Sequence, residues 1–144
     1  MQMDEQGYKQ VTIFIIDDDD VDFMAVQRCV QQLRLLNPII RARDGVEALQ
    51  MLQQQQVTAP YLILLDLNMP RMNGLEFLEQ IRHDPVLSTA VVFVLTTSSA
   101  DEDKVAAYRH HVAGYIVKHS PQNGFLNLFD MLEHYWRIVE LPSQ

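Results

Sequence analysis

Asp66 follows four consecutive aliphatic residues, Leu62 to Leu65, and is the strongest candidate for chemistry in the sequence. A strand this apolar is buried on both faces of a sheet, so its first charged residue emerges at the carboxyl end. In a parallel α/β sheet that end is the edge at which ligands bind. Pro70 and Gly74 then turn the chain toward the next helix. We therefore predict that Asp66 lies in a functional site.

Three other apolar runs end in groups that handle divalent cations or phosphate: the acids Asp17 and Asp18, the hydroxyl of Thr96 and the ammonium of Lys118. Carboxylate oxygens are ligands that a hard cation such as Mg²⁺ prefers. A hydroxyl and an ammonium stabilise the oxygens of a phosphoryl group. The four strand ends together predict phosphoryl transfer to a carboxylate.

Apolar runs alternate with helical patterns five times along the chain, which is typical of βαβ units and a parallel sheet. We predict strands over 11–16, 38–42, 61–66, 91–96 and 114–118. Helices are predicted between them from apolar residues at three- and four-residue steps. The fourth helix, near 101–110, has the weakest apolar stripe and is expected to be mobile or to face a partner. The last helix, from Phe125 to Val139, has the clearest apolar stripe.

Composition limits the function classes that remain. A chain of 144 residues allows one domain with its own core, and we predict a flexible segment over 1–9 followed by a single domain over 10–144, with an extended last helix and tail. The formal net charge of −8, without a basic run, argues against direct nucleic-acid binding. The sequence contains no stretch typical of a membrane span or signal peptide, so a cytoplasmic location is expected.

Cys29 is the single cysteine of the sequence. It cannot form an internal disulfide, which suits a reducing compartment. It lies among Val26, Val30 and Leu33 at helical spacing. We therefore interpret it as a small apolar residue of a helix face rather than a nucleophile.

The chemical motifs resemble the receiver domain of two-component response regulators. The resemblance rests on the acidic pair, the stretch from Asp66 to Gly74, Thr96 thirty residues after Asp66, and Lys118 twenty-two residues after Thr96. It covers roughly residues 10 to 138. Four elements in the right order and at matching spacing are specific, whereas each element alone is not.

Two further stretches narrow the resemblance. The Leu95–Ser98 stretch and the Tyr135-Trp136 ending, followed by Leu141-Pro142, are similar to the stand-alone regulators associated with bacterial phytochromes. This resemblance implies a flavodoxin-like, doubly wound, five-stranded parallel sheet of (βα)5 type with strand order 2-1-3-4-5.

The resemblance also implies a function. The protein would accept a phosphoryl group from a sensor histidine kinase, for this group a bacterial phytochrome, onto Asp66 with Mg²⁺ as cofactor. It would signal through protein contacts or a phosphorelay. It would catalyse its own phosphorylation and dephosphorylation rather than act as a conventional enzyme. A homodimer through the fourth helix, the fifth strand and the last helix is expected, with no direct contact to nucleic acid or membrane.

Residue roles follow from the same resemblance. The metal ligands would be the side chains of Asp17, Asp18 and Asp66 and the backbone carbonyl of Asn68. Thr96 and Lys118 would contact the phosphoryl oxygens, Thr96 and Tyr115 would form the conformational switch, and Asn68 and Ser98 would set the rate of dephosphorylation. One departure from the family pattern is His119, which follows the lysine where most receiver domains have proline.

The predicted pocket places three carboxylates against one ammonium. Repulsion between like charges is therefore expected to raise the pKa of at least one carboxylate. Asp19, Asp20 and Asp22 stand at the predicted start of the first helix, where acids favour helix capping and the helix dipole. We interpret these three as structural residues.

Two other functions stay open from the sequence. Asp17-x-Asp19 after an apolar strand also matches the nucleophile motif of haloacid-dehalogenase-type phosphatases, with Asp17 as nucleophile. That chemistry needs a further acid pair after the lysine, and it leaves Asp66 without a role. The second alternative is an interaction module that has the receiver fold but does not accept phosphate.

Overall fold

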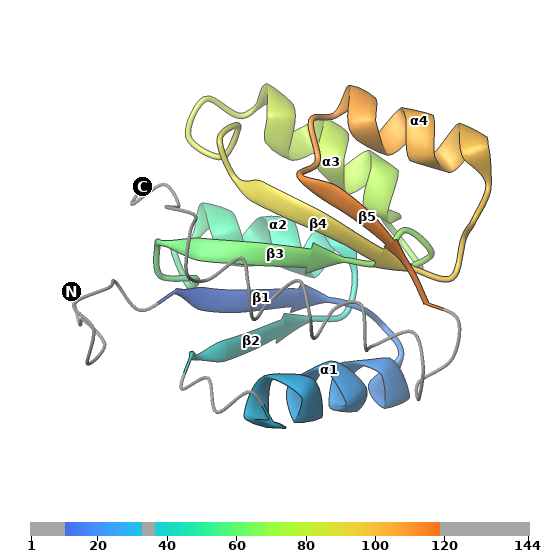
Figure 1. Cartoon of the computed structure of the whole chain (residues 1–144). Coiled ribbons are helices and arrows are strands. Elements are labelled where there is room, and N and C mark those ends of the chain that lie inside the picture. Colours follow the sequence, from blue (N-terminus) through green and yellow to red (C-terminus); the bar gives the residue numbers. More distant parts are fainter. Residues whose placement is uncertain (1–10, 33–36, 119–144) are drawn as a thin grey trace.

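A five-stranded parallel sheet forms the centre of the molecule (Figure 1). The computed structural model describes residues 11–32 and 37–118. Within them the strands are β1 (Thr12–Ile16), β2 (Ile39–Ala42), β3 (Tyr61–Leu65), β4 (Val91–Thr96) and β5 (Gly114–Val117). Their order in the sheet is β2-β1-β3-β4-β5. This order confirms the predicted topology, and each predicted strand boundary is correct to within one residue.

Four helices connect these strands: α1 (Asp20–Gln32), α2 (Gly45–Gln53), α3 (Gly74–His83) and α4 (Asp101–Arg109). The first three bury several apolar residues each, whereas α4 buries only Ala107. The predicted weak apolar stripe of the fourth helix is therefore confirmed. The predicted last helix and the N-terminal segment lie outside the described residues.

Both faces of the sheet are covered, which explains why the strands are apolar without alternation. Ile13 and Ile15 of β1 pack with α1, while Phe14 and Ile16 of the same strand pack in the core formed with α2, α3 and α4. Burying one such large apolar side chain stabilises a fold by about 1.5–3 kcal/mol. Cys29 of α1 belongs to the first of these cores, and burial raises the pKa of its thiol to about 11. The interpretation of Cys29 as a core residue is confirmed.

The turn between β3 and α3 fixes the chain that follows Asp66. Asn73 and Glu76 form a reciprocal capping box at the start of α3. A Cβ atom at Gly74 would lie 2.6 Å from the backbone oxygen of Asp66 and 2.8 Å from the Cα atom of Leu67. Only glycine therefore lets α3 begin this close to the end of β3.

No helix within the described residues is both long and apolar enough to cross a membrane.

Candidate functional site

Asp66 directly follows β3 and is largely buried at the carboxyl edge of the sheet. Its Oδ1 atom accepts a hydrogen bond from the Thr96 hydroxyl at 3.0 Å and another from the backbone N–H of Asn68 at 3.3 Å. Thr96 is the fully buried last residue of β4. The two neighbouring strands thus fix the orientation of the Asp66 carboxylate.

Lys118 follows β5 and brings a buried ammonium to the same edge. Its Nζ atom donates to Asp17 Oδ2 at 2.7 Å and to Asp22 Oδ2 at 2.9 Å, and lies 3.8 Å from Asp66 Oδ2. Only 4% of the Lys118 side chain is exposed. Burial alone would lower the pKa of Lys118, but the attraction of Asp17 and Asp66 outweighs it and the pKa is raised. The ammonium therefore stays charged at neutral pH.

Asp17 is the buried member of the acidic pair. Its Oδ1 atom accepts the backbone N–H of Asp19 at 2.9 Å. Burial raises the pKa of Asp17 to about 6, although the attraction of Lys118 opposes the increase. Repulsion from Asp66 adds a smaller increase. The predicted rise in a carboxylate pKa is thus present, but burial rather than like-charge repulsion is its main cause.

Asp17, Asp18 and Asp66 form a cluster suited to a divalent cation. Each residue offers a carboxylate oxygen, and these oxygens all lie within 4.8 Å of one another. Asp17 and Asp66 are buried, whereas Asp18 is exposed, so the cluster is open to solvent on one side. Hard anionic oxygens at this spacing fit a small, hard cation. The residues of the site therefore fit the cofactor that the sequence predicts.

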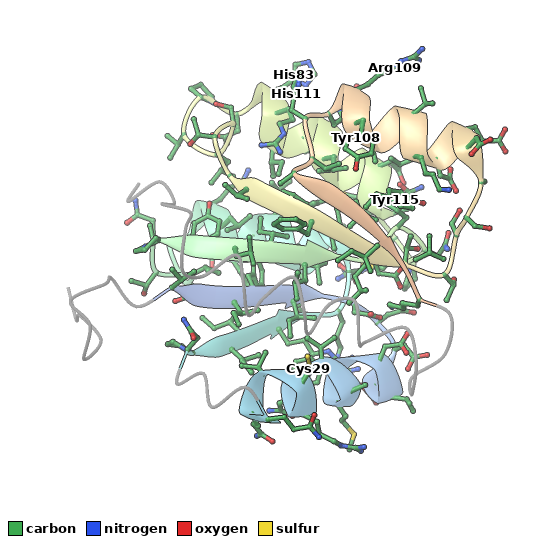
Figure 2. All side chains as sticks on the ribbon, in the orientation of Figure 1. Cys29, His83, Tyr108, Arg109, His111 and Tyr115 are labelled. Atoms are coloured by element: carbon green, nitrogen blue, oxygen red, sulfur yellow. The ribbon has the colours of Figure 1, made fainter. Side chains whose placement is uncertain are left out.

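The loop after β4 connects Thr96 with Tyr115. The backbone N–H of Ser98 donates to Thr96 Oγ1 at 3.4 Å, and the Tyr115 hydroxyl donates to the backbone oxygen of Ser98 at 2.9 Å. The Ser98 hydroxyl donates to Asp103 Oδ2 in α4 at 2.6 Å. Tyr115 is half-buried on β5, beside this loop (Figure 2). The two predicted switch residues thus belong to one hydrogen-bonded segment.

Asp22 belongs to the site, which the sequence interpretation missed. Capping does explain Asp19, whose Oδ1 atom accepts the backbone N–H groups of Val21 and Asp22. Asp20 instead forms ion pairs with arginine side chains, whereas Asp22 contacts Lys118. The available signal was spacing, because Asp22 lies about one helical turn beyond the acidic pair.

Arg71 anchors the loop that follows Asp66, and it too went unpredicted. Its guanidinium donates to both carboxylate oxygens of Asp44, at 2.8 and 3.1 Å. Asp44 in turn caps α2 by accepting the backbone N–H of Glu47 at 2.9 Å. This bidentate pair ties the β3–α3 loop to the start of α2.

A doubly wound parallel sheet with an acidic site at its carboxyl edge defines a flavodoxin-like α/β protein. Residues 13–130 match the family described as the response regulator receiver domain. The chain belongs to this family. The predicted fold and family are therefore confirmed.

Relatives that match nearly the whole chain include phytochrome-associated response regulators. The chain is 33% identical over 146 residues to the response regulator Rcp1 of Synechocystis sp., which covers 98% of this chain and 99% of Rcp1. It is similar to the structure of the phosphorylated cyanobacterial phytochrome response regulator RcpA, with a TM-score of 0.84, 32% identity and coverage of 94% and 100% of the two chains. The Mn²⁺-bound form of Rcp1 has a TM-score of 0.78 and 34% identity, and 92% and 99% of the two chains are covered.

The family match favours the receiver prediction over the phosphatase alternative. In the structure Asp66 lies at the centre of the site, in contact with Thr96 and close to Lys118. The phosphatase hypothesis gave this residue no role. The site in the structure is therefore built around a residue that the phosphatase hypothesis does not use.

Proposed function

We propose that Asp66 accepts a phosphoryl group from a histidine kinase in a reaction that requires Mg²⁺. One observation carries the proposal: the Asp66 carboxylate lies between two other potential cation ligands, Asp17 and Asp18, and a buried ammonium, Lys118. This arrangement surrounds the position of a transferred phosphoryl group with positive charge once a cation is present.

In the proposed reaction, a carboxylate oxygen of Asp66 attacks the phosphorus atom of a phosphohistidine. The new O–P bond forms as the P–N bond breaks, and the leaving imidazole keeps the electron pair and takes up a proton. Asp17, Asp18 and Asp66, with the backbone carbonyl of Asn68, would hold the Mg²⁺. When bound, the cation supplies charge that offsets the repulsion between an anionic acceptor and an anionic donor.

Lys118 and Thr96 are proposed to stabilise the product. The Lys118 ammonium would pair with one phosphoryl oxygen, and the Thr96 hydroxyl would donate to another. In the unmodified protein that hydroxyl donates to Asp66, so phosphorylation would redirect it. Because Thr96 is linked to Tyr115 through Ser98, we propose that the redirected bond changes the position of Tyr115.

Loss of the phosphoryl group is proposed to depend on Asn68 and Ser98. Hydrolysis requires a water molecule in line with the O–P bond, and small polar side chains at these two positions leave room for it. The Ser98 hydroxyl already donates to Asp103, so Ser98 would act mainly through its small size. Asn68 is exposed and would contact the water directly.

The proposed partners follow from the relatives and from the surface of α4. Since RcpA is described as a phytochrome response regulator, we propose that the kinase is a phytochrome. We also propose that the protein acts in the cytoplasm. The proposed homodimer uses α4 and β5, because Val105 and Tyr108 are about half exposed on α4. The part of this surface predicted on the last helix lies outside the described residues.

Incubation with acetyl phosphate, with and without Mg²⁺, followed by intact mass, tests the proposal. We expect the mass of one phosphoryl group to be added only with the cation, and not at all to Asp66→Asn, whose thermal unfolding should show an intact fold. Retained labelling of Asp66→Asn would contradict the acceptor assignment. Absence of labelling in the parent protein, under conditions that label a known receiver domain, would favour the interaction-module alternative.

A further inference from the structure

Asp22 is a partner of Lys118 that the proposed function does not use. The carboxylate belongs to the first turn of α1, and its Oδ2 atom accepts a hydrogen bond from the Lys118 ammonium at 2.9 Å. The Asp22 side chain is only 17% exposed. The contact joins residues ninety-six positions apart and connects the end of β5 to the start of α1.

The other carboxylates beside Lys118 have second tasks. Asp17 is one of the three potential cation ligands, and Asp66 is the proposed phosphoacceptor. A bound cation draws on the charge of Asp17 and so weakens its attraction for the ammonium. Phosphorylation likewise changes the group at Asp66. Among the described residues that form ion pairs with Lys118, Asp22 is the one that keeps its carboxylate available throughout.

Among the hydrogen bonds of the described residues, the Lys118 ammonium has one N–H donor left for the phosphoryl group. A lysine ammonium has three N–H donors. Asp17 and Asp22 accept two of them at 2.7 and 2.9 Å, whereas Asp66 at 3.8 Å is beyond hydrogen-bond distance. An oxygen of a phosphoryl group attached to Asp66 extends past the carboxylate and would approach the remaining donor without a large movement of Lys118.

We infer that Asp22 is a positioning residue that holds the Lys118 ammonium in place for the transferred phosphoryl group. This inference rests on the proposed phosphorylation of Asp66. Its action is indirect, because Asp22 has no contact with the Asp66 carboxylate among the hydrogen bonds and ion pairs of the described residues.

Electrostatic repulsion alone predicts the opposite effect of removing Asp22 on the rate of phosphorylation. Asp22 adds negative charge to an acidic site, and an anionic phosphodonor is repelled by it. If that repulsion dominated, removal of the carboxylate would accelerate phosphorylation. If positioning dominates, removal slows phosphorylation, because the ammonium loses a fixed partner.

The rate of labelling by acetyl phosphate with saturating Mg²⁺, followed by intact mass, separates the two effects. We expect Asp22→Ala to slow the reaction by about three- to tenfold, and Asp22→Asn to be slowed less because its amide oxygen still accepts a hydrogen bond. Asp20→Asn is the matched control. It removes the same charge from the same helical turn, but Asp20 pairs with Arg41 and Arg43, so its rate should equal that of the parent.

Lysine labelling gives a readout that does not depend on phosphorylation. The parent protein, with and without Mg²⁺, is treated with an amine-reactive ester, and modification of Lys118 is measured by peptide mass spectrometry. The parent Lys118 should react slowly in both conditions because its side chain is buried. In Asp22→Ala it should react several-fold faster, and most of all with Mg²⁺ present. The Asp20→Asn control should match the parent.

The outcomes distinguish this inference from the proposed function. If the parent protein is phosphorylated but Asp22→Ala reacts as fast or faster, Asp22 is not a positioning residue. The same holds if Asp22→Ala slows phosphorylation by the same factor in the Lys118→Met variant as in the parent protein, because the effect then does not depend on Lys118. Failure of the parent to be phosphorylated refutes the proposed function instead. If thermal unfolding shows that Asp22→Ala is not folded, the phosphorylation rate and the labelling of Lys118 are both measured on Asp22→Asn.

Discussion

Asp17 connects the protonation of the site to its use of a cation. Its pKa is raised to about 6, chiefly by burial, so a proton competes with a cation for this carboxylate just below neutral pH. Above the pKa the carboxylate is free to serve as a ligand. Below it, the neutral carboxyl group must first lose its proton. The affinity for a cation should therefore rise with pH.

We expect the Mg²⁺ affinity to increase as the pH rises from about 5 to about 7, approaching tenfold per pH unit below the pKa, and then to level off. Titration of the metal-free protein with Mg²⁺ at several pH values, monitored by NMR, measures this dependence. Asp17→Asn should bind more weakly and lose most of the dependence. An affinity that stays constant over this pH range in the parent protein would show that Asp17 does not limit cation binding.

The sequence predicts the central residues of the site because each follows an apolar run. Asp17, Asp66 and Lys118 come directly after strands whose carboxyl ends share one edge of the sheet, and the structure brings their side chains together. Asp22 was not predicted as a site residue, because an acid in the first turn of a helix has an ordinary capping explanation. Its contact with Lys118 depends on how α1 packs, which local sequence does not determine.

Helix α3 joins the loops at the edge of the sheet opposite the site. The guanidinium of Arg82 donates to four backbone oxygens. Ser88 and Ala90 precede β4, and His110 and His111 precede β5. One side chain thus satisfies carbonyl groups from two loops. Nothing in the helical pattern distinguishes Arg82 from a solvated residue, so this role could not be predicted.

Arg82→Ala should lower the free energy of unfolding by about 2–4 kcal/mol, because several carbonyl groups lose a charged donor. Urea unfolding measures the loss. Arg109→Ala on α4 is the control and should change the free energy by less than about 0.5 kcal/mol, since Arg109 is exposed and points away from the sheet (Figure 2). Equal stabilities of the two variants would contradict the structural role of Arg82. Phosphorylation of folded Arg82→Ala should be retained, because the site lies at the other edge.

The exposed face of α4 is proposed as the homodimer surface of the whole molecule. Light scattering over a range of concentrations should show association of the parent protein, and Val105→Ser should weaken it. Val86→Ser is a matched control, because Val86 is 72% exposed but precedes β4 rather than lying on α4. If the parent protein is strictly monomeric both with and without beryllium fluoride as a phosphoryl mimic, the dimer proposal is wrong.

The two cores of the molecule could be predicted more readily than the order of its strands. Continuous apolar strands such as β3 imply burial on both faces, and helices pack on both sides as expected. The order β2-β1-β3-β4-β5 followed from the family resemblance, since alternating strands and helices are compatible with several orders. The anchoring of the β3–α3 loop by Arg71 and Asp44 depends on residues far apart in sequence and was visible only in the fold.

Asp66 is the residue proposed to carry the phosphoryl group. The most direct measurement is to phosphorylate the parent protein with acetyl phosphate and Mg²⁺, reduce the acyl phosphate with borohydride, and locate the resulting homoserine by peptide sequencing. We expect homoserine at position 66 and aspartate at positions 17 and 18. Homoserine at position 17, with unmodified aspartate at position 66, would contradict the assignment of Asp66 as the phosphoacceptor.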